Sequence, residues 1–295
     1  MLDLHRLRLL REVKLRGSMS AAARELSYSH SAISQQLALL EKETRVVLLE
    51  RVGRNVKLTP AGEELVRNTE AILAAVERAE SDLASAHERP QGIVTVAAFA
   101  TISRTVMPRV LSALAEDYPG LDVRLQLHDP EEAVVRLIAR QVDAVITDSF
   151  PGTEPDAPGI HATALGDDPV RGYLPAGVTD ASPAALRDVR WAMEPRTSAA
   201  TQWALRVCRE RGFEPLVAHE SSDLLFHLRM VEAGLAAAFL PDIVLRESGS
   251  SLQPSAALPT GEHRGIVFLT RAGSEDRPAL TVIRDAVGRA LRGEL

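Results

Sequence analysis

Ser18–Thr59 reads SMSAAARELSYSHSAISQQLALLEKETRVVLLERVGRNVKLT, and this stretch decides how the chain begins to fold. Its first half predicts two helices separated by a turn at residues 27–29, because short hydroxyl side chains compete with a helix for backbone hydrogen bonds. In the second helix Ile33, Leu37 and Leu40 recur at steps of four and three. That spacing predicts a narrow apolar stripe that faces a core.

The opposite face of this second helix is small, polar and nearly free of acid, with Ser31, Gln35, Ala38 and Lys42 outward and His30 and Ser34 on its flank. An element that enters the DNA major groove needs such a face, because bulky side chains would clash with the DNA and acidic side chains would be repelled by its phosphates. An ordinary helical hairpin with a solvated face would show the same residues, so the helices alone leave both interpretations open.

A basic hairpin after the second helix favours the DNA interpretation. Residues 47–59 alternate around a turn at 53–55, which predicts a two-stranded wing with Gly-Arg-Asn near its tip. We assign Ser31, Ser34 and Gln35 to base edges, and His30, Arg51 and Arg54 to phosphates or the minor groove.

The N-terminal sixty residues resemble the winged helix-turn-helix of LysR-type transcriptional regulators. The resemblance rests on residues spread over the whole motif at the family's spacing: Leu7, Leu10, Val13, Gly17, Ser18, Ala22, Ala23, Leu26, Ser29, Ser34, Leu40, Glu41, Leu48, Arg51, Arg54, Leu58, Thr59 and Gly62. One departure follows the second helix, where the family has Leu-Gly and this chain has Thr44-Arg45. Glycine supplies a left-handed turn at that point, so the geometry between helix and wing is expected to differ slightly.

The charge of the chain is unevenly distributed. Its 295 residues carry a net charge of −6, yet residues 1–60 hold 11 Lys and Arg against 6 Asp and Glu, or +5, which leaves −11 for the rest. This distribution predicts that only the N-terminal part touches DNA. One cysteine, no signal peptide and no membrane-length apolar run predict a cytoplasmic protein without disulfides.

A long helix is predicted from Pro60 to about Glu88. Its apolar and small residues alternate at steps of four and three over three heptads, as in a coiled coil: Leu65, Thr69, Ile72, Val76, Ala79, Leu83 and Ala86. We expect this seam to pair with a second copy of the chain, and the resemblance implies an antiparallel dimerising linker. Packing of the helix on its own C-terminal body is the alternative.

From Gly92 onward, strands and helices alternate, which predicts a mainly parallel sheet covered by helices. The segments RVCRERGFEP and VEAGLAAAFLP resemble the family's periplasmic-binding-protein-like effector domain. The expected organisation is an all-α winged helix-turn-helix domain at 1–60, a linker helix at 61–89 and a two-lobed α/β effector-binding domain at 90–295. Lobe I would comprise 92–165 and 270–295, and lobe II would comprise 166–265.

A ligand site is expected where the strands of the two lobes end, since ligands of open α/β sheets bind beyond the carboxyl ends of the strands. The candidate residues follow strands or begin helices: Thr101, Ser103, His128, Asp148, Arg196, Thr197 and Ser198. The hydroxyls alone would be explained equally well as helix caps. Arg196 favours an anionic ligand such as a carboxylate, whereas Asp129 and Asp148 would suit an amine.

Other functions find little support in the sequence. There is no GxSxG elbow for a hydrolase and no His, Cys and carboxylate cluster with metal-ligand spacing, so neither an enzyme nor a metal or other cofactor is expected. Cys208 lacks a second cysteine and fits a buried structural thiol better than a redox sensor. Residues 92–295 alone would also suit a solute-binding protein, but the basic N-terminal part argues against that.

The resemblance therefore implies a one-component transcription regulator with a small-molecule effector. Its expected partners are double-stranded DNA, a second copy of itself in a homodimer or a dimer of dimers, and, as a further candidate, RNA polymerase. No membrane partner is expected.

Overall fold

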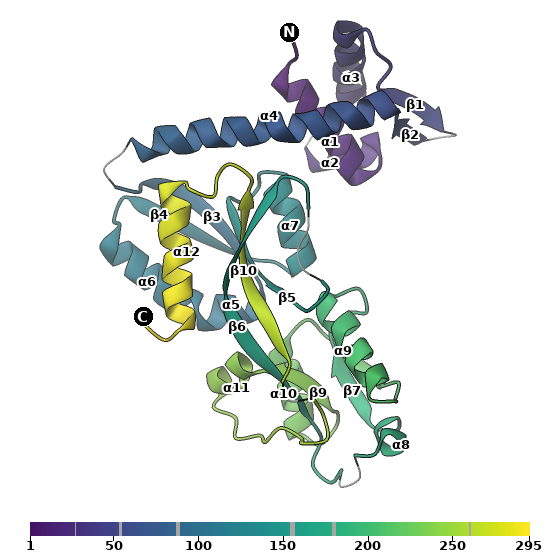
Figure 1. Cartoon of the computed structure of the whole chain (residues 1–295), viewed down its shortest axis with the longest axis vertical. Helices are drawn as coiled ribbons and strands as arrows, with labels where there is room; N and C mark the ends of the chain where they lie inside the picture. Colours follow the sequence, from purple (N-terminus) through teal and green to yellow (C-terminus); the bar gives the residue numbers. More distant parts are fainter. Residues whose placement is uncertain (27, 53–54, 87–88, 154–156, 179–180, 260) are drawn as a thin grey trace. The chain divides into compact units, whose positions relative to one another are not determined.

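The computed structural model describes the chain except for residues 27, 53–54, 87–88, 154–156, 179–180 and 260, and it describes the backbone alone at residues 25, 51, 52 and 55 (Figure 1). The chain divides into two compact units, Met1–Glu80 and Ser81–Leu295. Each unit has its own hydrophobic core.

The first unit begins with three short helices: α1 (Leu4–Arg16), α2 (Met19–Glu25) and α3 (His30–Thr44). Serine side chains cap the N-termini of α2 and α3. The Ser18 hydroxyl accepts a hydrogen bond from the Ala21 N–H at 3.2 Å, and the Ser29 hydroxyl accepts one from the Ala32 N–H at 3.1 Å. The predicted inward stripe of α3 is confirmed, since all of its members are at most 1% exposed: Ile33, Leu37 and Leu40.

The turn after α3 is left-handed even without glycine. Arg45 ends the helix with φ 56° and ψ 30°, the left-handed conformation that glycine most readily adopts. A side chain in that region is disfavoured by roughly 1–2 kcal/mol, so Arg45 keeps the turn at some expense in stability. The departure at Thr44-Arg45 therefore changes the residue and not the handedness of the turn.

Replacing Arg45 with Gly is expected to raise the free energy of unfolding by about 0.5–1 kcal/mol, because Gly relieves the left-handed strain but gains entropy in the unfolded chain. Urea denaturation would measure the change. Lys42→Gly, at a right-handed position of α3, is the control and should lower stability by about 1 kcal/mol. If the two variants lose stability alike, the Arg45 backbone is not strained.

The predicted wing is present as β1 (Leu49–Val52) paired antiparallel with β2 (Asn55–Leu58). Its predicted tip lies mostly outside the described residues. Glu41 ties the wing to α3, because its carboxylate accepts the N–H groups of Leu48 at 2.8 Å and Leu49 at 3.1 Å. A Cβ on Gly62 would lie 2.3 Å from the Leu48 carbonyl oxygen, so only glycine fits there.

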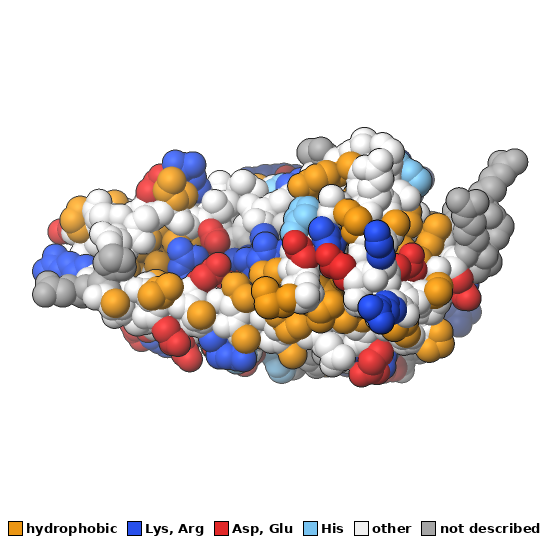
Figure 2. Space-filling view, turned by 90° about the horizontal axis from the view of Figure 1, so that it is seen from above, with side chains coloured by type: hydrophobic (Ala, Val, Ile, Leu, Met, Phe, Trp, Pro, Cys, Tyr) orange, Lys and Arg blue, Asp and Glu red, His pale blue; other side chains and the backbone are white. Residues whose placement is uncertain are grey.

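The long helix is α4 (Pro60–Ser85), and its predicted end near Glu88 lies outside the described residues. Leu65 packs against the core of the first unit, whereas Ile72 is 37% and Leu83 is 73% exposed. Hydrophobic side chains also lie exposed between charged ones on the face shown in Figure 2. The later part of the predicted seam thus carries large apolar side chains that the chain itself leaves in water.

The second unit is built on a six-stranded sheet in the order β4-β3-β5-β10-β6-β9. The strands are β3 (Gly92–Ala98), β4 (Leu121–Leu127), β5 (Ala144–Ser149), β6 (Ile160–Tyr173), β9 (Ala238–Pro241) and β10 (His263–Arg271). Only the β4-β3-β5 part is parallel, so the prediction of a mainly parallel sheet is wrong for the rest. The chain leaves the first lobe along β6 and returns along β10, and neighbouring strands that run out and back must pair antiparallel.

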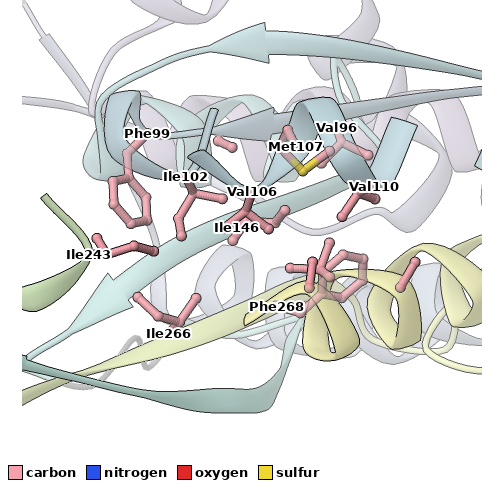
Figure 3. Packing of buried hydrophobic residues seen from close by; sticks show 14 of the residues in the cluster. Val96, Phe99, Ile102, Val106, Met107, Val110, Ile146, Ile243, Ile266 and Phe268 are labelled. Atoms are coloured by element: carbon pink, nitrogen blue, oxygen red, sulfur yellow. The ribbon is translucent and has the colours of Figure 1, made fainter. Parts of the chain in front are cut away.

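Helices cover both faces of this sheet (Figure 1). The helices α5 (Ala100–Thr105), α6 (Met107–Asp117) and α12 (Pro278–Leu291) share one core with alternate strand residues such as Ile146 and Phe268 (Figure 3). The helix α7 (Pro130–Ile138) packs on the other face against Val145 and Val267. Successive residues of β5 and β10 therefore serve opposite faces, which is why the runs 144–146 and 266–269 are wholly apolar.

The second lobe adds the parallel pair β7 (Arg190–Met193) and β8 (Leu216–Glu220). Its helices are α8 (Pro183–Leu186), α9 (Ala199–Glu210), α10 (Leu224–Glu232) and α11 (Asp242–Ser248). Cys208 is buried in this lobe, and burial, with a smaller effect of Glu214, raises its thiol pKa to about 12. Such a thiol stays protonated, which supports its interpretation as structural.

In the part of the chain that the structure describes, no helix combines the length and apolarity that crossing a membrane requires.

Candidate functional sites

The outward face of α3 brings most of the predicted DNA contacts together. His30, Ser31 and Gln35 are exposed and Ser34 is half-buried, on the side opposite the buried stripe. The hydroxyl oxygens of Ser29 and Ser31 lie 3.0 Å apart, so Ser31 is held near the start of the helix. Arg54 lies outside the described residues, and the Arg51 side chain is not described either, so their assignments stay predictions.

The two acids near the end of α3 are engaged elsewhere. Glu41 accepts backbone N–H groups of the wing, and Glu43 pairs with Arg6 of α1. Arg6 also donates from Nε to the Gln36 side-chain oxygen at 3.0 Å, which fixes α1 against α3. The outward face of α3 therefore presents hydroxyl, amide and imidazole groups without a free carboxylate, as a surface that meets phosphates requires.

A cavity of about 110 Å³ lies between the two lobes of the second unit. Its walls come from the ends of strands and the starts of α5, α7 and α9, as the strand-end rule predicts. Four of the seven predicted ligand residues line it: Thr101, Asp148, Thr197 and Ser198. The Ser198 hydroxyl also caps α9 by accepting the Thr201 N–H at 3.1 Å, so the capping interpretation is correct for this residue as well.

The other three predicted residues lie away from the cavity walls. The Ser103 hydroxyl turns back to donate to the Ala98 carbonyl at 3.1 Å. His128 lies 3.2 Å from the Gln126 side-chain oxygen and 3.4 Å from Glu132. Arg196 is exposed, and its carbonyl accepts a hydrogen bond from the Gln202 amide at 2.6 Å. A position shortly after a strand therefore predicted a backbone close to the cavity. It did not predict whether the side chain points into the cavity.

Arg264 of β10 is the main cavity residue that the sequence did not reveal. Its side chain is 1% exposed, and it donates from Nη1 to Asp148 at 2.9 Å and from Nε and Nη2 to Asp168 at 3.1 and 3.0 Å. The guanidinium also lies 5.1 Å from the centre of the Phe99 ring. An arginine at the start of a strand whose later residues are apolar and buried was the available signal.

Glu194 follows β7 and is the second lining residue that the sequence did not reveal. Burial raises the pKa of its carboxyl to about 8, and the nearby Asp148 carboxylate raises it further, while Arg264 and a hydrogen bond from Ser198 oppose the shift. At neutral pH this carboxyl is therefore mostly protonated and without charge.

A smaller apolar cavity of about 30 Å³ adjoins the first, and the two share Glu194, Leu224 and Arg264 in their walls. Phe150, Trp203 and Phe239 line it together, and the Trp203 ring centre lies 5.1 Å from that of Phe150 and 5.2 Å from that of Phe239. The pair of cavities thus offers a polar compartment beside a narrow aromatic one.

Comparison with known families identifies both parts of the chain. The family described as "LysR substrate binding domain" matches residues 87–292, and "Bacterial regulatory helix-turn-helix protein, lysR family" matches residues 4–63. The chain belongs to the LysR family of transcription regulators. Membership confirms the fold class predicted from the sequence and the prediction that the chain is a regulator and not an enzyme.

Two curated relatives illustrate the similarity to other members of the LysR family. "Transcriptional dual regulator GltC" of Bacillus subtilis is 28% identical over 254 residues, which cover 84% of this chain and 83% of that protein. The "RuBisCO operon transcriptional regulator" of Allochromatium vinosum is 30% identical over 215 residues, which cover 71% of this chain and 70% of that protein.

Solved structures show the same LysR fold. ArgP from Mycobacterium tuberculosis has a TM-score of 0.60 at 19% identity and covers 99% of this chain and 98% of its own. Full-length CbnR in complex with its target DNA has a TM-score of 0.53 at 24% identity, and the match covers 98% of this chain and 99% of the CbnR chain.

Among the described residues of this chain, no group of three or more His, Cys, Asp or Glu side chains lies close enough together to hold a metal ion.

Proposed function

We propose that this regulator reads a pseudo-palindromic operator by inserting α3 in the major groove, with Ser31, Ser34 and Gln35 at base edges. The observation that carries the proposal is the outward face of α3, which is polar, exposed and without a free carboxylate. His30, Arg51 and Arg54 would hold phosphates or the minor groove and set the register of the helix. A cytoplasmic location follows from the need to reach DNA.

Dimerisation through α4 supplies the second recognition helix that a pseudo-palindrome requires. The exposed apolar side chains of Ile72 and Leu83 support this role for the helix. A small-molecule effector in the inter-lobe cavity would change the angle between the lobes and so the spacing of the DNA-binding units. RNA polymerase is the further partner of such a regulator, and pairing of dimers would extend the contact to four half-sites.

Binding to the DNA immediately upstream of the protein's own gene tests the proposal. Fluorescence anisotropy should show tighter binding to that DNA than to a scrambled duplex, with affinity falling steeply as salt rises. Equal affinity for both duplexes at every salt concentration would argue against an operator at that place. Retained specificity without any salt dependence would argue against the phosphate contacts.

Replacing Gln35 with Ala is expected to weaken operator binding by about 1–3 kcal/mol and to leave binding to scrambled DNA unchanged, because the Gln amide can form a bidentate pair with adenine. The same anisotropy assay measures both values. Gln253→Ala is the matched control, since Gln253 is exposed in the second unit and should affect neither. An equal loss on operator and scrambled DNA would show that Gln35 contacts no base.

A further inference from the structure

The inter-lobe cavity has an acidic wall. Among the described residues that line it, four carry carboxyl groups and one is a cation: Asp129, Glu131, Asp148 and Glu194 against Arg264. With Glu194 protonated at neutral pH, three carboxylates still face one guanidinium. A ligand that enters this space therefore meets a net negative surface.

The single cation of the wall is not available to a ligand anion. Arg264 is 1% exposed and already donates to two carboxylates, Asp148 at 2.9 Å and Asp168 at 3.0 Å. A third carboxylate would compete for the same guanidinium while it faced the exposed Asp129 and Glu131. Repulsion between like charges in a cavity that partly excludes water disfavours binding of a carboxylate ligand.

The start of α9 is the remaining place for an anion, and it is partly occupied. The Ser198 hydroxyl accepts the Thr201 N–H at 3.1 Å, and the Thr201 hydroxyl donates to the Glu194 carbonyl at 2.8 Å. Among the described residues at the start of α9, Thr197 offers the hydroxyl that faces the cavity without a hydrogen bond to the rest of the described chain. Cavity hydroxyls such as that of Thr197 accept hydrogen bonds from an ammonium group as readily as they donate to a carboxylate.

The adjoining aromatic cavity limits the rest of the ligand. At about 30 Å³, and lined by Phe150, Trp203 and Phe239, it accepts a short branched alkyl group. Glu194 and Arg264 lie in the shared wall, so a ligand that spans both cavities carries its polar end among the carboxylates.

We propose that the effector is a small organic cation, a primary ammonium with a short apolar group and without a carboxylate. Asp129, Glu131 and Asp148 would face its ammonium, and Phe150, Trp203 and Phe239 would enclose its apolar end. The proposal rests on the effector role of the cavity proposed above and names the chemical class that this role requires. It departs from the carboxylate that Arg196 favours in the sequence, because Arg196 lies outside the cavity walls.

Three ligands of matched shape test the class: leucine, its decarboxylated amine 3-methylbutylamine and its deaminated acid 4-methylpentanoate. Binding to the full-length protein is measured by calorimetry in phosphate buffer, which is free of amines. The fluorescence of the chain's two tryptophans provides a second readout, because Trp203 lines the apolar cavity and Trp191 lies in the same core. The amine should bind at least about tenfold more tightly than the acid, with leucine between them.

Charge-neutralising variants place the ligand in the cavity. Asp129→Asn and Glu131→Gln change exposed lining residues and should each weaken amine binding roughly fivefold. Glu132→Gln is the matched control, since Glu132 stands next in α7 but pairs with Arg136 at 2.7 Å outside the cavity walls. Its amine affinity should equal that of the unchanged protein.

The pH dependence of ligand binding is an independent test of the ligand's charge. The pKa of Glu194 lies near 8, so this carboxyl ionises as pH rises from 6.5 to 8.5, and the amine should bind more tightly over that interval while the acid binds more weakly. The groups that face Glu194 are Asp148, Arg264, Ser198 and Glu131, with His227 in the adjoining wall. Burial lowers the pKa of His227, so it stays neutral there. Glu194→Gln should remove the pH dependence.

The outcomes separate this proposal from the function on which it rests. Tighter binding of 4-methylpentanoate or leucine, lost in the cavity variants, would overturn the cationic class and keep the effector site. Binding of none of the three at millimolar concentration would overturn the class as well. Amine binding that leaves operator affinity and DNase footprint unchanged would support the chemistry of the cavity and refute its coupling to DNA.

Discussion

Replacing Leu83 with Glu is expected to convert the dimer proposed above to a monomer and to weaken operator binding on the order of 100-fold. Leu83 is 73% exposed in the single chain, and pairing of two α4 helices would bury it. A glutamate in that interface places a carboxylate in an apolar seam. The monomer then loses the gain in affinity that comes from linking two half-site contacts. Analytical ultracentrifugation would measure the mass, and anisotropy the affinity.

Ser85→Glu is the control for this change. Ser85 is also exposed, but it lies two residues further along α4, on the side opposite the seam. The variant should remain dimeric and bind operator DNA like the unchanged protein. A dimeric Leu83→Glu protein would show that subunits associate through another surface and that the exposed seam of α4 has a different purpose.

Local sequence patterns predicted the first unit well because its structure depends on neighbours in the chain. The spacing of Ile33, Leu37 and Leu40 defines a helix face over two turns, and the caps at Ser18 and Ser29 act within three residues. The left-handed Arg45 escaped prediction, because propensity favours Gly there and only the surrounding structure holds another residue in that conformation.

Long-range pairing limited the prediction of the second unit. The antiparallel run of β10 between β5 and β6 joins residues that are 94 (His263 and Pro169) to 126 (Thr270 and Ala144) positions apart, and strand periodicity contains no information about direction. The site was affected in the same way. Thr101, Thr197 and Ser198 were found from their positions after strands, but the partnership of Arg264 with Asp168 spans 96 residues and has no local signal.

Replacing Arg264 with Met is expected to lower the free energy of unfolding by about 3–5 kcal/mol, since it leaves buried carboxylates without their cation. Asp168 is 4% and Asp148 11% exposed at the side chain, so water cannot replace the guanidinium at Asp168. Urea denaturation at fixed protein concentration measures the loss. Arg209→Met removes an exposed pair with Glu214, whose side chains are 59% and 58% exposed, and should cost less than about 1 kcal/mol.

A double variant distinguishes lost attraction from an unpaired buried charge. Asp168→Asn removes the buried charge but keeps an oxygen that can accept the Ile243 N–H, which the Asp168 carboxylate accepts at 3.1 Å. Combined with Arg264→Met, it should restore at least about 1 kcal/mol of the loss, because no uncompensated charge remains at this position. If the double variant is less stable than Arg264→Met alone, the stability loss of Arg264→Met comes mainly from lost packing of the arginine stem. The unpaired charge of Asp168 then does not explain it.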